Sequence, residues 1–222
     1  MKKTLHIKRR EINSDTSFWQ DFSFESEDES ATVATALMTL PVAWSHSCLQ
    51  KKCGACAMVI NGRPSLACDV RLSELKGDMV TIEPLRKFPV IEDLLVDRDS
   101  LMARLKQNNA WFEEEAKAHG EELAFESGKC LQCGLCLEVC PNFHNEGNYG
   151  GMALMTVMSQ IMSKAPDMQK KDLGKNYRKN VYNGCGKSLA CRDICPAKID
   201  MEKLLVKSNA AALWNKWDET NK

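Results

Sequence analysis

The feature that most constrains this chain is a run of four cysteines between residues 130 and 140. Cys130, Cys133, Cys136 and Cys140 follow the spacing C-x2-C-x2-C-x3-C, and Pro141 comes directly after them. This spacing is typical of segments that hold three corners of one iron–sulfur cluster and one corner of a second. A zinc site more often combines two separated C-x2-C pairs. We therefore predict that this stretch binds iron–sulfur clusters.

A second group of cysteines repeats this pattern with one member missing. Cys185, Cys191 and Cys195 occupy the first, third and fourth positions, Pro196 follows, and Ser188 stands in the second position. The fourth cysteine of each such run binds the cluster of the other run, so the two groups combine into two sites.

The crossed pairing assigns seven cysteines. The predicted ligands of a [4Fe–4S] cluster are Cys130, Cys133, Cys136 and Cys195. The predicted ligands of the other site are Cys140, Cys185 and Cys191, with an open corner that faces Ser188. Three thiolates favour a [3Fe–4S] cluster. The alternative is a [4Fe–4S] cluster with serine, water or a substrate on its fourth iron.

A third group lies earlier in the chain. Cys48, Cys53, Cys56 and Cys68 are close to the plant-type [2Fe–2S] spacing, in which a distant fourth cysteine follows C-x4-C-x2-C. Gly54 allows the backbone to approach the cluster closely. We expect Cys68 to arrive from the strand after a hairpin; the alternative is that it is a core cysteine. The three sites together use all 11 cysteines.

Composition narrows the class of protein. The 222 residues carry 30 basic and 30 acidic side chains, and nothing in this balance indicates nucleic acid as a partner. The N-terminus lacks the apolar segment of a secretory signal, and we expect no transmembrane segment. Clustered cysteines in such a chain bind metal more often than they form disulfides.

The sequence predicts an α+β fold with two domains, residues 1–96 and 97–222. In the first domain we expect a helix capped by Ser30 and a hairpin turn at Asn61-Gly62. The expected elements of that domain are strands 4–9, 18–24, 57–60, 64–67 and 79–83 and a helix over 31–40. In the second domain we expect helices over 91–107, 109–126, 151–164 and 201–215.

These motifs resemble the iron–sulfur subunit of succinate dehydrogenase and fumarate reductase. The resemblance covers nearly the whole chain, including Cys53-Gly-Ala-Cys56-Ala-Met and the stretch from Asn61-Gly62 to Leu66-Ala67-Cys68. It implies a β-grasp [2Fe–2S] ferredoxin-like domain followed by an all-α dicluster ferredoxin-like domain. It also implies electron transfer within the tricarboxylic acid cycle or anaerobic respiration, with no catalytic residue on this chain.

The resemblance also implies partners. They are a flavoprotein subunit with FAD and the dicarboxylate site, and a membrane anchor with a quinone and, in some members, haem. The chain would lie peripherally on the cytoplasmic face of the inner membrane.

One region departs from the family. His144 stands where tryptophan is often seen, and Gly186 stands where histidine is often seen. Pro141 and His144 are therefore candidates for the quinone vicinity, and the alternative for His144 is a surface or packing role. Because of this departure, the alternative function is the same electron relay serving a different flavoprotein, or a soluble electron donor such as a thiol instead of a quinone. A redox-sensing regulator is a third function class.

Overall fold

The computed structural model describes residues 1–113 and 121–214 and contains two compact units. The first unit comprises Met1–Arg98 and Cys133–Glu138, and the second comprises Asp99–Gln132 and Val139–Lys222. The cysteine run at 130–140 is thus divided between the units. The domain boundary that the sequence predicts after residue 96 remains a prediction. Mixed strands and helices confirm the α+β class.

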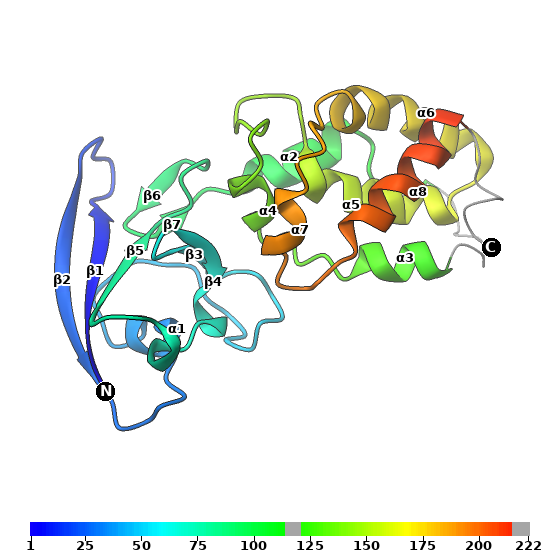
Figure 1. Ribbon diagram of the computed structural model, residues 1–222. Helices are drawn as coiled ribbons and strands as arrows, with labels where there is room; N and C mark the ends of the chain where they lie inside the picture. The colour runs from blue at the N-terminus through cyan, green and yellow to red at the C-terminus, as the bar shows by residue number, and fades with distance from the viewer. Residues whose placement is uncertain (114–120, 215–222) are drawn as a thin grey trace. The chain divides into compact units, whose positions relative to one another are not determined.

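A five-stranded mixed sheet forms the first unit, in the order β2-β1-β5-β3-β4 (Figure 1). Only β1 and β5 pair in parallel, and Leu5, Ile7, Val80 and Ile82 from these two central strands are fully buried. The strands are β1 Lys2–Arg10, β2 Ser17–Glu25, β3 Ala57–Ile60, β4 Arg63–Leu66 and β5 Met79–Glu83. The predicted strands are therefore confirmed.

Short helical elements cover this unit. Helix α1 (Val33–Leu37) is shorter than the predicted helix, and its N-cap is Thr32 rather than Ser30. Thr32 and Thr35 form a reciprocal capping box, which satisfies two backbone N–H groups at once. Two 3-10 turns follow β4, η1 (Ala67–Asp69) and η2 (Leu72–Glu74).

The helix predicted over 91–107 is wrong in its first half. The chain forms a small hairpin of β6 (Val90–Glu92) and β7 (Leu95–Val96) before helix α2 (Asp99–Gln107). Asp93 adopts a left-handed turn conformation with φ 47° and is 3% exposed. Its carboxylate accepts hydrogen bonds from Arg9 Nε at 3.0 Å and from the backbone N–H of Ala43 at 3.0 Å. These long-range hydrogen bonds fix the turn, and the local periodicity of the sequence cannot predict them.

Residues Cys133–Glu138 pack with the first unit. Helix α4 (Leu135–Glu138) buries Leu135 and Leu137. The Glu138 carboxylate accepts from the backbone N–H groups of Arg86 and Lys87, at 3.0 and 3.1 Å. Half of the cysteine run is therefore fixed by ordinary core and hydrogen-bond contacts.

The second unit is built around α5 (Gly151–Lys164), as predicted. Its methionines are buried, with Met158 and Met162 at 0% exposure. Figure 1 shows α2, α6 and α8 around this helix. The other helical elements are α3 Glu121–Gly128, α6 Asp167–Tyr177, the π-helical turn η3 Arg178–Tyr182, α7 Ala190–Ile194 and α8 Met201–Trp214.

The helix predicted over 109–126 is wrong at its start. Asn109 has φ 51°, a left-handed conformation that ends α2, and residues 110–113 are not helical. Residues 114–120 lie outside the described part of the chain, and a helix is present from Glu121. Residue 215, the last of the final predicted helix, also lies outside it.

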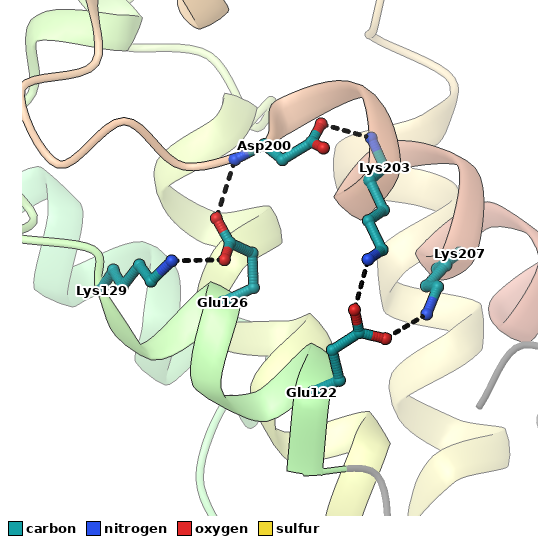
Figure 2. A network of polar contacts seen from close by, with 6 residues as sticks. All are labelled: Glu122, Glu126, Lys129, Asp200, Lys203 and Lys207. Carbon is teal, nitrogen blue, oxygen red and sulfur yellow. Dashed lines mark hydrogen bonds and ion pairs between the residues drawn. The ribbon is translucent and has the colours of Figure 1, made fainter. Parts of the chain in front are cut away.

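Helices α3 and α8 are joined by a network of charged side chains (Figure 2). Glu122 accepts from Lys203 and, at 3.0 Å, from Lys207. Glu126 accepts from the Asp200 backbone N–H at 2.9 Å and from Lys129. The pKa of Glu122 is lowered to about 2, first by the hydrogen bond from Lys203 and then by that from Lys207. This network orients the first turn of α8, which follows Cys195 in the chain.

Candidate iron–sulfur sites

The first group of cysteines lies in an irregular loop whose backbone amides point at sulfur. The N–H groups of Gln50 and Lys52 approach Cys48 Sγ at 3.3 and 3.4 Å, and that of Lys51 approaches Cys68 Sγ at 3.3 Å. Lys51 has φ 59°, and Leu49 and Gly54 are also left-handed. Such alternation turns successive N–H groups inward and makes a concave anion site.

The sulfur atoms of this loop come in two pairs. Cys56 Sγ and Cys68 Sγ are 3.4 Å apart, and Cys48 is hydrogen-bonded to Cys53. Two thiolates on one tetrahedral metal with bonds of about 2.3 Å are about 3.8 Å apart, so each pair suits one iron atom. Cys68 lies in the 3-10 turn η1 rather than in a strand, which corrects the predicted element but keeps it beside the loop.

The thiol pKa values in this loop differ in direction. Backbone amides of Gln50 and Lys52 lower the pKa of Cys48 to about 7, whereas burial raises the pKa of Cys56 to about 12. A ligand must be a thiolate, so metal binding would expel the Cys56 proton. The loop and η1 thus supply four sulfur donors, and the loop adds N–H groups that stabilise negative charge on Cys48 and Cys68.

The second set of predicted ligands has its own local supports. Gln132, with φ 50°, donates from Nε2 to Cys130 Sγ at 3.2 Å and to the Ala153 carbonyl at 3.0 Å. Cys133 is 8% exposed, and Cys195 follows the last residue of α7. Gly134 has φ 85°, and a Cβ there would lie 3.1 Å from the Phe88 ring. Glycine is therefore required between Cys133 and the helix that carries Cys136.

The third set lies in the second unit and depends on side chains. Tyr149 Oη is 3.9 Å from Cys140 Sγ, and its ring lies against Gly184, where a Cβ would be 2.4 Å from Tyr149 Cδ2. Asn142 Nδ2 donates to the Gly184 carbonyl at 2.7 Å. These contacts bring the segment after Cys140 beside the segment that carries Cys185.

The other residues of the third set differ in burial. Cys191 lies in α7, and burial raises its pKa to about 11; burial also raises the pKa of Tyr149. Ser188 is exposed, between the left-handed residues Lys187 and Leu189. The position with the missing cysteine is therefore accessible to solvent, in a tightly turned loop.

Pro141 and His144 are both exposed, on a segment held by a buried arginine. Arg104 is 4% exposed and donates to the carbonyls of His144, Asn145 and Gly147 at 3.3, 2.6 and 3.0 Å. Its guanidinium also lies 4.9 Å from the Phe143 ring centre. The backbone beside His144 is therefore fixed.

Three residues of these sites carry no sequence signal. Arg98, Arg104 and Tyr149 contact residues that are distant in the chain. Nothing in the local sequence distinguishes them from ordinary helix, loop or turn residues. Arg98 donates to carbonyls of the first cysteine loop and of Cys133, and burial lowers its pKa.

All 11 cysteines lie in the described ranges, and none of them forms a disulfide there. Over residues 1–113 and 121–214, no three His, Cys, Asp or Glu side chains converge as a single metal ion requires. Thiolates of a cluster bind different iron atoms, so they do not need to converge on one point. The donor set is all sulfur, with N–H groups directed at Cys48, Cys68 and Cys130, and it fits clusters.

Comparison with known proteins agrees with this chemistry. Residues 4–103 match the model of a 2Fe-2S iron-sulfur cluster binding domain, and residues 126–199 match that of a 4Fe-4S dicluster domain. The succinate dehydrogenase iron-sulfur subunit of Bacillus subtilis is 31% identical over 73% of this chain and 69% of its own length. The fumarate reductase iron-sulfur subunit of Mycobacterium tuberculosis is 31% identical over 73% of this chain and 70% of its own.

A solved structure shares the fold. A chain of the Mycobacterium smegmatis Sdh1 complex in the apo form superposes with a TM-score of 0.75 at 23% identity, covering 98% of both chains. Among the helices described here, none has the length and apolar character needed to cross a membrane. The matched domains and relatives lead to one conclusion: this chain belongs to the family of iron–sulfur subunits of succinate dehydrogenase and fumarate reductase.

Proposed function

We propose that this subunit relays electrons between a FAD-containing flavoprotein and a quinone at a membrane anchor. When bound, three clusters would supply a series of one-electron carriers. The observation that carries the proposal is the set of eleven thiols in three groups, with backbone amides already directed at sulfur in the first group. The dicarboxylate chemistry would belong to the flavoprotein, and this chain would contribute no catalytic acid or base.

The proposed ligand sets follow the three groups. A [2Fe–2S] cluster would be held by Cys48, Cys53, Cys56 and Cys68. A [4Fe–4S] cluster would be held by Cys130, Cys133, Cys136 and Cys195. A [3Fe–4S] cluster would be held by Cys140, Cys185 and Cys191, with Ser188 in place of a fourth thiol. A β-grasp first domain and an all-α second domain are part of the same proposal.

The chain's own residues fix and tune these sites. Backbone N–H groups at residues 50–52 and the Gln132 amide neutralise thiolate charge. Hydrogen bonds to cluster sulfurs favour the more negative, reduced state and so raise the reduction potential. At the far end, the segment fixed by Arg104 would present Pro141 and His144 to the acceptor. The imidazole of His144 has one donor and one acceptor nitrogen and is suited to hydrogen-bond a quinone or to exchange a proton with it.

The proposal places the subunit peripherally on the cytoplasmic face of the inner membrane. Two measurements test it: iron and acid-labile sulfide in the anaerobically purified chain, and the partners that co-purify with a tagged chain from its native host. We expect content sufficient for three clusters, a flavoprotein and a membrane anchor. Zinc with negligible sulfide would refute the proposal. A soluble complex without an anchor would favour the alternative, in which the relay serves a thiol or other soluble donor.

A further inference from the structure

Arg98 joins two cysteine-bearing segments of the first unit through neutral acceptors. Its Nη1 donates to the Gly54 carbonyl at 3.1 Å and to the Cys133 carbonyl at 3.2 Å, and its Nη2 donates to the Ala55 carbonyl at 3.0 Å. Gly54 and Ala55 lie between Cys53 and Cys56 in the chain. One guanidinium is therefore bound both to the first cysteine loop and to the first residue of the segment Cys133–Glu138.

The electrostatic surroundings of this cation are sulfur atoms. Arg98 is partly buried, which lowers its pKa, and the cysteines whose ionised form would favour its charge are Cys133 and, from the first cysteine group, Cys56 and Cys53. These three acceptors are carbonyl oxygens, which orient the guanidinium without cancelling its charge. A partly buried charge is screened less by solvent and salt than an exposed one.

We propose that Arg98 is a positioning residue of the relay whose positive charge favours the reduced state of the [2Fe–2S] site. The inference rests on the proposed function, because it needs a cluster at Cys48, Cys53, Cys56 and Cys68. Reduction adds one negative charge to that site, and a fixed cation nearby stabilises the product more than the reactant. The planar fork of arginine is needed to hold carbonyls from two segments, whereas lysine offers one point charge.

The test is an EPR-monitored redox titration of the anaerobically purified full chain, in wild type and in the variants Arg98→Met and Arg98→Lys. At the wild-type midpoint potential, Arg98→Met lowers the ratio of reduced to oxidised [2Fe–2S] about tenfold, a downward shift of about 59 mV for one electron. Arg98→Lys keeps the charge and lowers this ratio less than Arg98→Met does. The matched control is Arg71→Met, which removes an exposed arginine of the same unit, 59% exposed and paired with Glu74, and leaves the midpoint unchanged.

The possible outcomes distinguish the inferred role of Arg98 from the proposed function of the chain. An assembled [2Fe–2S] site with an unchanged midpoint in Arg98→Met overturns the inference and leaves the proposed function standing. Loss of the cluster in both Arg98 variants shows a purely structural anchor and also overturns it. Loss of the [2Fe–2S] cluster in Arg98→Met, with retention of the cluster in Arg98→Lys, supports the need for a positive charge at position 98. Absence of a [2Fe–2S] signal in the wild-type chain refutes the proposed function itself.

Discussion

The loop around Cys48 and the segments around Cys140 and Cys185 support their sulfur atoms in different ways. In the first site, backbone N–H groups of consecutive residues point at sulfur, and left-handed residues such as Lys51 create that geometry. In the third site, the supports are the side chains of Tyr149 and Asn142, and Gly184 leaves space for one of them. The side chains of the loop residues themselves are thus expected to matter little in the first site, which Arg98 holds from outside the loop, whereas side-chain identity is expected to matter greatly in the third.

Burial raises thiol pKa values in both sites, that of Cys56 in the first to about 12 and that of Cys191 in the third to about 11, while backbone amides lower that of Cys48 to about 7. The two sites differ in the separation of their ligands along the chain. The ligands of the first site come from one loop and from the turn η1 that follows the β3–β4 hairpin, so they meet once this part of the first unit folds. A site made by distant segments forms only after the helices of the second unit pack, because loop closure costs entropy before its contacts compensate.

The largest effect is expected from paired ligand replacements. Cys140→Ser removes one thiolate from the third site, so the [3Fe–4S] EPR signal disappears while the [2Fe–2S] signal persists. Cys68→Ser produces the reverse pattern. If Cys140→Ser instead abolished the [4Fe–4S] signal and spared the [3Fe–4S] signal, the crossed assignment of the fourth cysteines would be wrong.

A smaller but selective loss is expected from Gly184→Ala. The new Cβ would lie 2.4 Å from Tyr149 Cδ2, so the ring must move away from the Cys185 segment. Overpacking of this kind costs about 1–3 kcal/mol. We expect the [3Fe–4S] content, measured as EPR spins per chain, to fall severalfold with the [2Fe–2S] content unchanged.

Gly147→Ala is the matched control for that variant. A Cβ at Gly147 meets the His144 carbonyl at 3.5 Å, an ordinary contact, in the same unit and on the segment that carries Tyr149. Equal losses in the two variants would argue against side-chain packing as the support of the third site.

In the first site, a side-chain change should have little effect. Lys51→Ala removes the ion pair with Asp69 but keeps the backbone N–H directed at Cys68. Partly exposed ion pairs contribute less than about 1 kcal/mol, so stability measured by chemical denaturation changes by no more than that. The [2Fe–2S] spectrum should be retained. Loss of the cluster would show that the lysine side chain, and not the backbone, supports this loop.

The smallest effect is expected at Glu122, whose partners are Lys203 and Lys207 rather than residues of the cysteine groups. Its pKa is about 2 in the fold against 4.5 unperturbed, so its stabilising effect is complete above pH 4.5 and is lost as the pH falls toward 2. Glu122→Gln should slightly lower the melting temperature at neutral pH and flatten its decline between those pH values. Cluster content should not change. An unaltered acid profile would show that the α3–α8 network in Figure 2 contributes nothing to stability.

Local signals in the sequence predicted the elements that local interactions determine. The Asn61-Gly62 turn, with φ 47° and 76°, fixes its hairpin by itself, and the periodicity of residues 151–164 matches α5. Periodicity does not predict the hairpin at 90–96, because Asp93 at its turn is held by Arg9, a contact distant in the chain. Cysteine spacing gave the candidate ligands, but the roles of Arg98 and Tyr149 depend on which distant segments meet.

The most direct test of the account is low-temperature EPR on the anaerobically purified full chain. The account predicts two signals in separate oxidation states: a reduced [2Fe–2S] signal that depends on Cys68, and an oxidised [3Fe–4S] signal that depends on Cys140. An intact preparation with no oxidised [3Fe–4S] signal would contradict the assignment of Cys140, Cys185 and Cys191 to an incomplete cluster.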